Sequence, residues 1–401
     1  MSRVFMVCAA IVLLAIVSTC ASAETKVVVT VERKTSSAVA SVKPPFDGKR
    51  AAVDVAILLD TSNSMDGLIG QAKSQLWTIV NQFARAKKAG QTPVLRVALF
   101  EYGNTALPAS EGYLRQVVPL TDDLDKLSEA LFALTTSGGD EYCGQVIDEA
   151  ITRLDWSKAR NGYKAIFIAG NEPFTQGSVD YHKACKRAVE RGIVVNTIHC
   201  GDNAAGMQGE WNVGAQLAEG EFFNIDQDRV VVTIKCPQDE IIIRLNDELN
   251  RTYLWFGAEP LRRGYGENQI AQDQNAFRCP AGTSRFSAKA SGCYQNVGRD
   301  LVDTIKEDGE ILTKIKTDEL PEPLQGKTIA EQEAYVNEMS TKRGEVQRKI
   351  NRLTAEREAY IAKERKRLAM ESGDETLGDA VVTAVRRQLA RSGFEESAEV
   401  N

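Results

Sequence analysis

The sequence predicts an α/β protein in which a doubly wound, mostly parallel sheet is followed by a C-terminal α-helical hairpin region. Three observations lead to this prediction. Short apolar runs bounded by turn-forming residues, typical of buried strands, recur between residues 53 and 225. Stretches with apolar residues at helical spacing alternate with them, as in a doubly wound sheet. From residue 294 the apolar residues keep a three-four rhythm, which indicates helices.

The elements of the predicted sheet follow one another from residue 53 onward. The first strand begins at Val53 and ends in a polar loop, and the next helix carries apolar residues from Leu68 to Phe83. The further expected strands are 93–102, 113–120, 163–169, 193–200 and 221–225. The further expected helices are 123–134, 142–154, 179–191, 213–218 and 239–256. Residues 50–257 are therefore expected to form one domain with every element that such a sheet needs.

The chain after residue 257 is expected to be helical. Residues 258–292 are polar and interrupted by prolines and glycines, and we expect a connector there. Residues 293–371 are expected to form the helical hairpin or coiled-coil-like region, with a long helix that follows the capping-box pair Thr328 and Glu331. Residues 372–401 add a short helix and a polar tail. These helices also offer a surface for oligomerisation.

The end of the first strand carries the most informative motif. The segment from Val53 to Met65 reads VDVAILLDTSNSM, which places Asp60, Ser62 and Ser64 on one tight loop. A carboxylate and two hydroxyls are hard oxygen donors, and they suit a divalent cation such as Mg²⁺ that keeps a position for a ligand. Ligands bind at this edge of open parallel sheets. The alternative is that these residues only cap the helix that follows.

The strand, the D-x-S-x-S motif and the helix resemble the first segment of a von Willebrand factor type A (VWA) domain. The resemblance extends over about residues 53–257. It implies a metal-ion-dependent adhesion site (MIDAS) in which Asp60, Ser62 and Ser64 hold Mg²⁺, or Mn²⁺ or Ca²⁺. It further implies a protein ligand whose Asp or Glu completes the coordination of the ion.

A second acidic cluster occupies the position where the family places another metal ligand in a Gly-Gly loop. The loop 137–142 reads SGGDEY, so Asp140 is the leading candidate ligand and Glu141 the alternative. Taken alone, the two acidic residues could equally be a helix start favoured by the helix dipole. The pairing with the first motif favours the metal site.

The third ligand position of the family departs from the pattern in this chain. The family has an Asp followed by Gly after the strand 163–169, and this chain has Gly170 and Asn171 there. Gly170 has no side chain to offer. Asn171, a weak candidate ligand, or Glu172 is expected to supply an oxygen nearby, or water fills the gap.

The first 23 residues resemble a secretory signal segment. Arg3 precedes an apolar stretch, and the sequence ASA at 21–23 predicts cleavage after Ala23 and a periplasmic or secreted protein. Cys20 gives an alternative interpretation that ranks second, a lipoprotein, because a lipobox-like sequence precedes it. Residues 24–49 are expected to be an extension or linker. After removal of the signal, no apolar segment is long enough to span a membrane.

Export would change the net charge of the chain and the expected state of its cysteines. Removal of the signal segment takes away one charged residue, Arg3, so the net charge changes from −6 to about −7. This balance argues against a nucleic-acid partner. An even number of cysteines in an exported chain predicts disulfides, although core filling is the alternative for those on apolar helix faces. The candidate cysteines are Cys143, Cys185, Cys200, Cys236, Cys279 and Cys293.

No pattern in the sequence indicates an enzyme. The chain has two histidines, His182 and His199, separated by a helix and a strand, and it has neither a P-loop nor a G-x-G-x-x-G motif. We therefore expect an exported binding protein that captures a protein partner through a divalent cation. The alternative is a structural scaffold of the cell envelope that acts through its C-terminal helices and has a degenerate metal site.

Overall fold

The computed structural model describes residues 50–66, 69–159, 161–225, 234–277, 282–372 and 377–396. Three parts of the sequence lie outside the described residues. They are the expected signal segment with Cys20, the whole expected linker 24–49, and Cys279.

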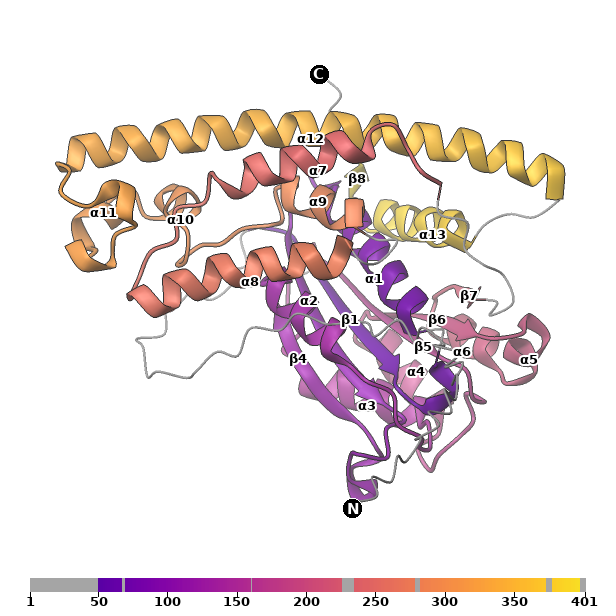
Figure 1. Ribbon diagram of the computed structural model, residues 1–401. Helices are drawn as coiled ribbons and strands as arrows, with labels where there is room; N and C mark the ends of the chain where they lie inside the picture. The colour runs from indigo at the N-terminus through magenta and orange to yellow at the C-terminus, as the bar shows by residue number, and fades with distance from the viewer. Residues whose placement is uncertain are drawn as a thin grey trace, which may run out of the picture.

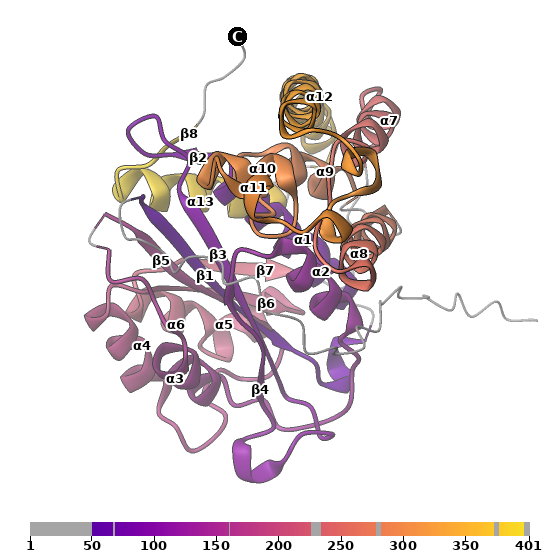
Figure 2. The same ribbon diagram turned by 90° about the vertical axis from the view of Figure 1, so that its left-hand side faces the viewer.

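A six-stranded sheet forms the centre of the molecule, with the strand order β4-β3-β1-β5-β6-β7 (Figures 1 and 2). Its strands are β1 (Ala52–Asp60), β3 (Val94–Tyr102), β4 (Arg115–Thr121), β5 (Tyr163–Gly170), β6 (Val194–Cys200) and β7 (Phe222–Ile225). All neighbouring strands run parallel except β3 and β4, which are antiparallel. The predicted fold class, a mostly parallel doubly wound sheet with a C-terminal helical region, is confirmed.

The central strand β1 is buried over its whole length. Its alternate residues enter two separate hydrophobic cores, with Ala56 and Leu58 on one face and Ile57 and Leu59 on the other. A strand buried on both faces needs a continuous apolar run, and this is why the segment AVDVAILL has so few polar residues. The polar motif begins only where β1 reaches the edge of the sheet.

Helices cover both faces of the sheet (Figure 2). One face is covered by α3 (Cys143–Arg153), α4 (Tyr181–Glu190) and α6 (Trp211–Leu217), with the short α5 (Asn203–Gln208) beside α6. On the opposite face lie α1 (Ile69–Ala84) and α2 (Leu124–Ala133). Single turns of 3-10 helix occur at η1 (Asn63–Met65), η2 (Ala109–Glu111), η3 (Thr317–Glu319) and η4 (Glu322–Leu324).

Helices that follow the last strand of the sheet complete the face that carries α1. They are α7 (Asp239–Asn250), α8 (Glu259–Phe277), α9 (Gly282–Ala290), α12 (Ile329–Ser372) and α13 (Leu377–Arg391). Both α9 and α13 pack directly against α1, and α13 also contacts β7. Phe286, Ile350 and Val385 therefore belong to the same hydrophobic core as Leu59 of β1. The sheet thus shares this core with α7, α9, α12 and α13.

A buried polar contact fixes α13 on the sheet. The hydroxyl of Tyr163 donates to Gln388 Oε1 at 2.5 Å, and Gln388 Nε2 donates to Asn196 Oδ1 at 2.7 Å. Just after α13 the chain pairs in antiparallel fashion with the end of the α1 region, through β2 (Ala86–Lys87) and β8 (Glu395–Glu396). The C-terminus is thus tied to the sheet domain by specific polar contacts as well as by apolar packing.

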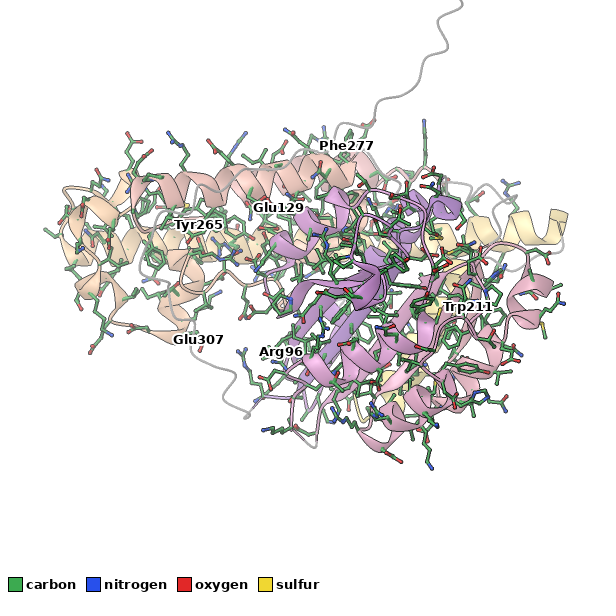
Figure 3. All side chains as sticks on the ribbon, turned by 90° about the horizontal axis from the view of Figure 1, so that it is seen from below. Arg96, Glu129, Trp211, Tyr265, Phe277 and Glu307 are labelled. Atoms are coloured by element: carbon green, nitrogen blue, oxygen red, sulfur yellow. The ribbon has the colours of Figure 1, made fainter. Side chains whose placement is uncertain are left out.

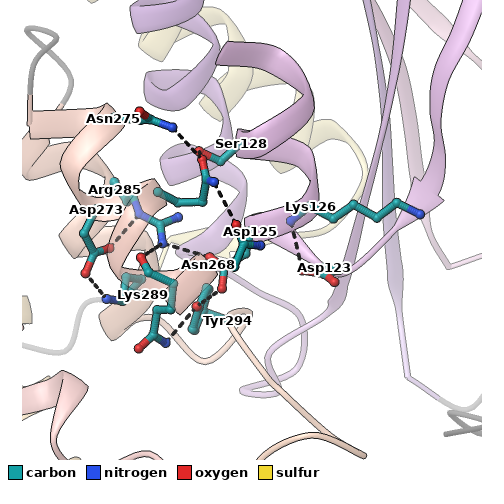
Figure 4. Close-up of polar contacts among 12 residues, drawn as sticks. Asp123, Asp125, Lys126, Ser128, Asn268, Asp273, Asn275, Arg285, Lys289 and Tyr294 are labelled. Carbon is teal, nitrogen blue, oxygen red and sulfur yellow. Dashed lines mark hydrogen bonds and ion pairs between the residues drawn. The ribbon is translucent and has the colours of Figure 1, made fainter. Parts of the chain in front are cut away.

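A second buried network joins α2 to α8 and α9 (Figure 4). Arg285 binds Asp125 at 2.8 Å and Asp273 at 2.7 Å, and Lys289 binds Asp273 at 2.7 Å. The hydroxyl of Tyr294 donates to the other oxygen of Asp125 at 2.7 Å. Charged groups are kept this far from water only when they are paired and hydrogen-bonded, as they are here.

The expected helical hairpin in 293–371 is not formed. The long helix is present as α12, which packs mainly on α7 and α9. The preceding segment forms only the short α10 (Leu301–Glu307) and α11 (Ile311–Lys314), which pack on the first part of α12, besides 3-10 turns. Residues 258–292, expected to be a connector, carry α8 and α9. The apolar pattern misled because Arg343, which interrupts the stripe of α12, points inward and binds Asp300 at 2.7 Å. None of the described helices combines the length and the apolar character needed to cross a membrane.

Candidate metal centre

β1 and β5 are neighbours in the sheet, and their carboxyl ends flank the point where the order of strands reverses. From β1 the chain passes to β3 and β4 on one side, and it then returns to β5 on the other. This arrangement opens a crevice between the loops that follow the two strands, and ligands of doubly wound sheets bind there. Asp60 is the last residue of β1 and Gly170 the last of β5.

Backbone contacts hold the other loops beside this crevice. The amide of Ser137 donates to the carbonyl of Thr61 at 2.9 Å, and the amide of Thr105 donates to the carbonyl of Gly138 at 2.8 Å. The loop after α2 is therefore tied both to the motif after β1 and to the loop after β3. These contacts bring the acidic segment 140–141 to the edge of the sheet.

Two carboxylates are buried together in this crevice. Asp60 is fully buried and Glu141 is 4 % exposed. Gly103, with a φ of 76°, lies between them, and a Cβ at this position would come within 2.7 Å of Asp60 Oδ1 and 2.8 Å of Glu141 Cγ. Only glycine leaves room there and tolerates this backbone conformation. The two acidic side chains thus share one enclosed space.

A row of oxygen atoms leads from the buried carboxylates to the surface. Asp60 Oδ1 accepts a hydrogen bond from the backbone amide of Ser62 at 2.7 Å. The Oγ atoms of Ser62 and Ser64 lie 2.8 Å apart, and Ser64 Oγ donates to Asn171 Oδ1 at 2.9 Å. Ser62 is buried and Ser64 is exposed. The donors therefore form a site that is closed at the carboxylates and open at Ser64 and Asn171.

The electrostatics of the two carboxylates fit a divalent cation. Asp60 Oδ2 is buried without a hydrogen-bond partner. Burial raises the pKa of Asp60 to about 7, and burial together with the charge of Asp60 raises the pKa of Glu141 to about 8. No cationic side chain is among the main influences on either pKa. A bound cation with a preference for oxygen ligands would satisfy the orphaned oxygen and neutralise both groups.

The donor set is mixed rather than purely acidic. In the part of the chain that the structure describes, no group of three or more His, Cys, Asp and Glu side chains is placed to hold a metal ion. The centre instead combines two carboxylates with two hydroxyls and one amide oxygen. Neutral oxygens of this kind are ligands for Mg²⁺, Mn²⁺ or Ca²⁺ and leave room for water or a ligand.

The structure separates the two acidic candidates of the second motif. Asp140, the leading candidate, is exposed, and its Oδ2 accepts a hydrogen bond from the hydroxyl of Tyr142 at 3.0 Å. The alternative, Glu141, is the one that lies beside Asp60. Successive side chains of an extended loop point in opposite directions, so only one of the two can face Asp60. Gln176 accepts from the backbone amide of Glu141 at 2.8 Å and fixes this choice.

Sequence reasoning missed the residues that position the loop after β5. His199 is buried, and its Nε2 lies 3.2 Å from the carbonyl oxygen of Asn171 while its Nδ1 lies 2.8 Å from Asn224 Oδ1. The indole of Trp211 (labelled in Figure 3) donates to the carbonyl of Glu172 at 2.8 Å. The place of His199 at the carboxyl end of a predicted strand was the only signal for this role.

The disulfide prediction is wrong for the cysteines that the structure describes. Free, buried thiols are present at Cys143, Cys185, Cys200 and Cys293, and Cys236 is buried as well. Cys143 and Cys185 pack in the core on the α3 side of the sheet, whereas Cys200 and Cys293 pack in the core on the α1 side. The sheet separates these pairs, and the residues act as small apolar side chains.

The comparison with protein families agrees with the fold. Residues 54–210 match the family model described as the von Willebrand factor type A domain. This part of the chain is therefore a VWA domain, as the resemblance of the motifs implied. No curated protein matches the chain.

Several solved structures are similar to the sheet domain. BatB from Bacteroides thetaiotaomicron is 18 % identical, with 43 % of this chain and 90 % of BatB covered and a TM-score of 0.33. The VWA domain of SpRpn10 is 18 % identical, with 44 % and 89 % covered and a TM-score of 0.34. Proximal thread matrix protein 1 from the mussel byssus, with a zinc-occupied MIDAS motif, is 14 % identical, with 45 % and 43 % covered and a TM-score of 0.34. Likenesses this weak carry no inference about function.

Proposed function

We propose that this protein is a binding protein that captures a protein partner through a divalent cation. The cation would be held by Asp60, Ser62, Ser64, Glu141 and Asn171. The observation that carries the proposal is the buried Oδ2 of Asp60, which has no hydrogen-bond partner although it lies in a cluster of oxygen donors. A buried carboxylate oxygen without a partner costs folding free energy, and a cation at this point would remove that cost.

The direction in which the site opens supports binding rather than a purely structural ion. The carboxylates lie at the closed end, and the exposed Ser64 lies at the open end. When bound, a divalent cation supplies a positive charge and an unfilled coordination position. An Asp or Glu of a partner protein has the charge and the oxygen atoms to fill that position. We propose Mg²⁺ as the physiological ion, with Mn²⁺ and Ca²⁺ as alternatives of the same oxygen-binding class.

The matched pair Asp60→Asn and Asp140→Asn tests partner capture. Both substitutions remove one carboxylate, but only Asp60 lies in the cluster. Purified protein immobilised on beads is exposed to envelope extract with Mg²⁺ or with EDTA. We expect the parent and Asp140→Asn to retain the same protein band only with Mg²⁺, and Asp60→Asn to retain none. Capture that EDTA and Asp60→Asn leave unchanged would contradict the proposal and favour the scaffold alternative.

We also propose that the protein acts outside the cytoplasm. The proposal is supported by the signal-like residues 1–23 with the ASA sequence before Glu24. Expression of the full chain in a bacterium, followed by fractionation and sequencing of the mature N-terminus, tests it. We expect a periplasmic or secreted product that begins at Glu24, and an uncleaved cytoplasmic product would contradict it.

A further inference from the structure

We propose that Glu141 supplies the second carboxylate of the cation site, in place of a side chain that Tyr102 excludes from position 170. This inference rests on the proposed function and assigns the ligands within the same site. It concerns two glycines that border Asp60 on different sides. Gly103 borders Oδ1, where Glu141 approaches, and Gly170 borders Oδ2.

The space beside Gly170 belongs to Tyr102. A Cβ at position 170 would lie 3.1 Å from Asp60 Oδ2, so a side chain there would face the unpartnered oxygen directly. The same Cβ would come closer than 3.0 Å to the hydroxyl oxygen of Tyr102, a distance that real Cβ contacts do not show. Position 170 therefore cannot carry a carboxylate while the Tyr102 hydroxyl is in place.

The Tyr102 hydroxyl is held where it is and cannot serve Asp60. It donates to the carbonyl oxygen of Ala169 at 3.0 Å, and Cys143 Sγ lies 3.8 Å away. Tyr102 is fully buried. Its one proton is used on Ala169, so it does not donate to Asp60 Oδ2. The Tyr102 hydroxyl thus closes the crevice on this side.

The opposite side of Asp60 is shaped to admit a carboxylate. Gly103 leaves the space that the Glu141 side chain enters, and the backbone amide of Glu141 is anchored on Gln176 at 2.8 Å. Glu141 is buried, whereas its neighbour Asp140 is exposed and bonds to Tyr142. The second negative charge therefore comes from the loop after α2 and not from the end of β5.

A rescue experiment tests this assignment, with calorimetric titration of Mn²⁺ as the probe. We expect Glu141→Gln to weaken Mn²⁺ binding at least about tenfold, while the control Asp140→Asn keeps the parent affinity. In the Glu141→Gln background, Gly170→Asp together with Tyr102→Phe should recover affinity to within a few-fold of the parent. Gly170→Asp with Tyr102 intact should not recover it. Circular dichroism in EDTA confirms that each variant is folded.

A thermal double-mutant cycle tests the role of Tyr102 without any metal. Gly170→Ala should lower the melting temperature in the parent, and it should lower it less in the Tyr102→Phe background because the clash is gone. Double-mutant cycles isolate such a coupling from the separate cost of each change. Equal shifts in both backgrounds would overturn the exclusion of position 170 by Tyr102.

The outcomes separate this inference from the proposed function. Parent protein that binds no divalent cation contradicts both. If the parent binds Mn²⁺ and Asp60→Asn abolishes binding, but Glu141→Gln binds as the parent does, the proposed function stands and the inference is overturned. A folded triple variant that fails to recover affinity also overturns it.

Discussion

Gln388 of α13 and Asn196 of β6 form a reciprocal pair of buried amides. Gln388 Nε2 donates to Asn196 Oδ1 at 2.7 Å, and Asn196 Nδ2 donates to Gln388 Oε1 at 3.3 Å. The two residues lie 192 positions apart in the chain. A helix that follows the long α12 is thus fastened to β6, so the C-terminal helix α13 is a part of the sheet domain's fold.

The first prediction concerns a fragment that ends at Gly257. The sequence alone predicts that residues 50–257 form one domain, whereas in the structure Phe286, Ile350 and Val385 belong to the core that covers one face of the sheet. We expect the fragment to bind a hydrophobic dye and to melt at a lower temperature than the full protein, or without a cooperative transition. A fragment that melts cooperatively at the temperature of the full protein would contradict the shared core.

The second prediction concerns the amide pair. Gln388→Ala should lower the free energy of unfolding by about 1–3 kcal/mol, because Asn196 Nδ2 and the Tyr163 hydroxyl would lose their buried hydrogen-bond partner. Thr383→Ala, at an exposed position of the same helix, is the matched control and should change it by less than about 0.5 kcal/mol. Chemical denaturation of both variants measures the difference. Equal effects would show that the amide pair does not fasten α13.

The third prediction concerns the network between α2 and α9. Arg285→Met should destabilise the protein by about 3–5 kcal/mol, because Asp125 and Asp273 would lose their common cation while buried. The control is Arg263→Met, which removes an exposed guanidinium 3.4 Å from Glu259 and should cost less than about 1 kcal/mol. Urea denaturation compares them. A small effect of Arg285→Met would contradict a dry, paired network.

The fourth prediction is a dependence of stability on pH that comes from Asp273. Burial by itself would raise the pKa of Asp273, but Lys289 and Arg285 hold it well below its usual range. A carboxyl group with a lowered pKa in the folded state contributes stability at pH values above its unfolded pKa of about 3.9. That contribution is lost as the pH falls further. We expect the unfolding free energy to drop below about pH 4, and less so in Asp273→Asn. Identical acid profiles would contradict this prediction.

Local patterns predicted the sheet because its strands are buried on both faces. The apolar run of β1 and the polar motif after it are adjacent in the sequence, so both could be recognised together. The choice between Asp140 and Glu141 could not be predicted, because it depends on the space beside Gly103 and on the anchor at Gln176. These residues lie in other loops and meet only in the folded chain.

The C-terminal packing was harder to predict for a related reason. Arg343 interrupts the apolar stripe of α12, and such an imperfect stripe favours a helical hairpin. Its partner Asp300 lies 43 positions away and makes the position an interior one. An apolar pattern predicts which apolar residues are buried, but it does not predict which charged residues are buried with a partner of opposite charge.

The central claim is that Asp60 and Glu141 form the closed end of a divalent-cation site. Calorimetric titration of Mg²⁺ and Mn²⁺ into the parent, Asp60→Asn, Glu141→Gln and Asp140→Asn proteins tests it most directly. The structure predicts saturable binding of one ion by the parent and by Asp140→Asn, with binding lost in Asp60→Asn and weakened at least about tenfold in Glu141→Gln. Equal affinity in all four proteins, or no binding by the parent, would contradict it.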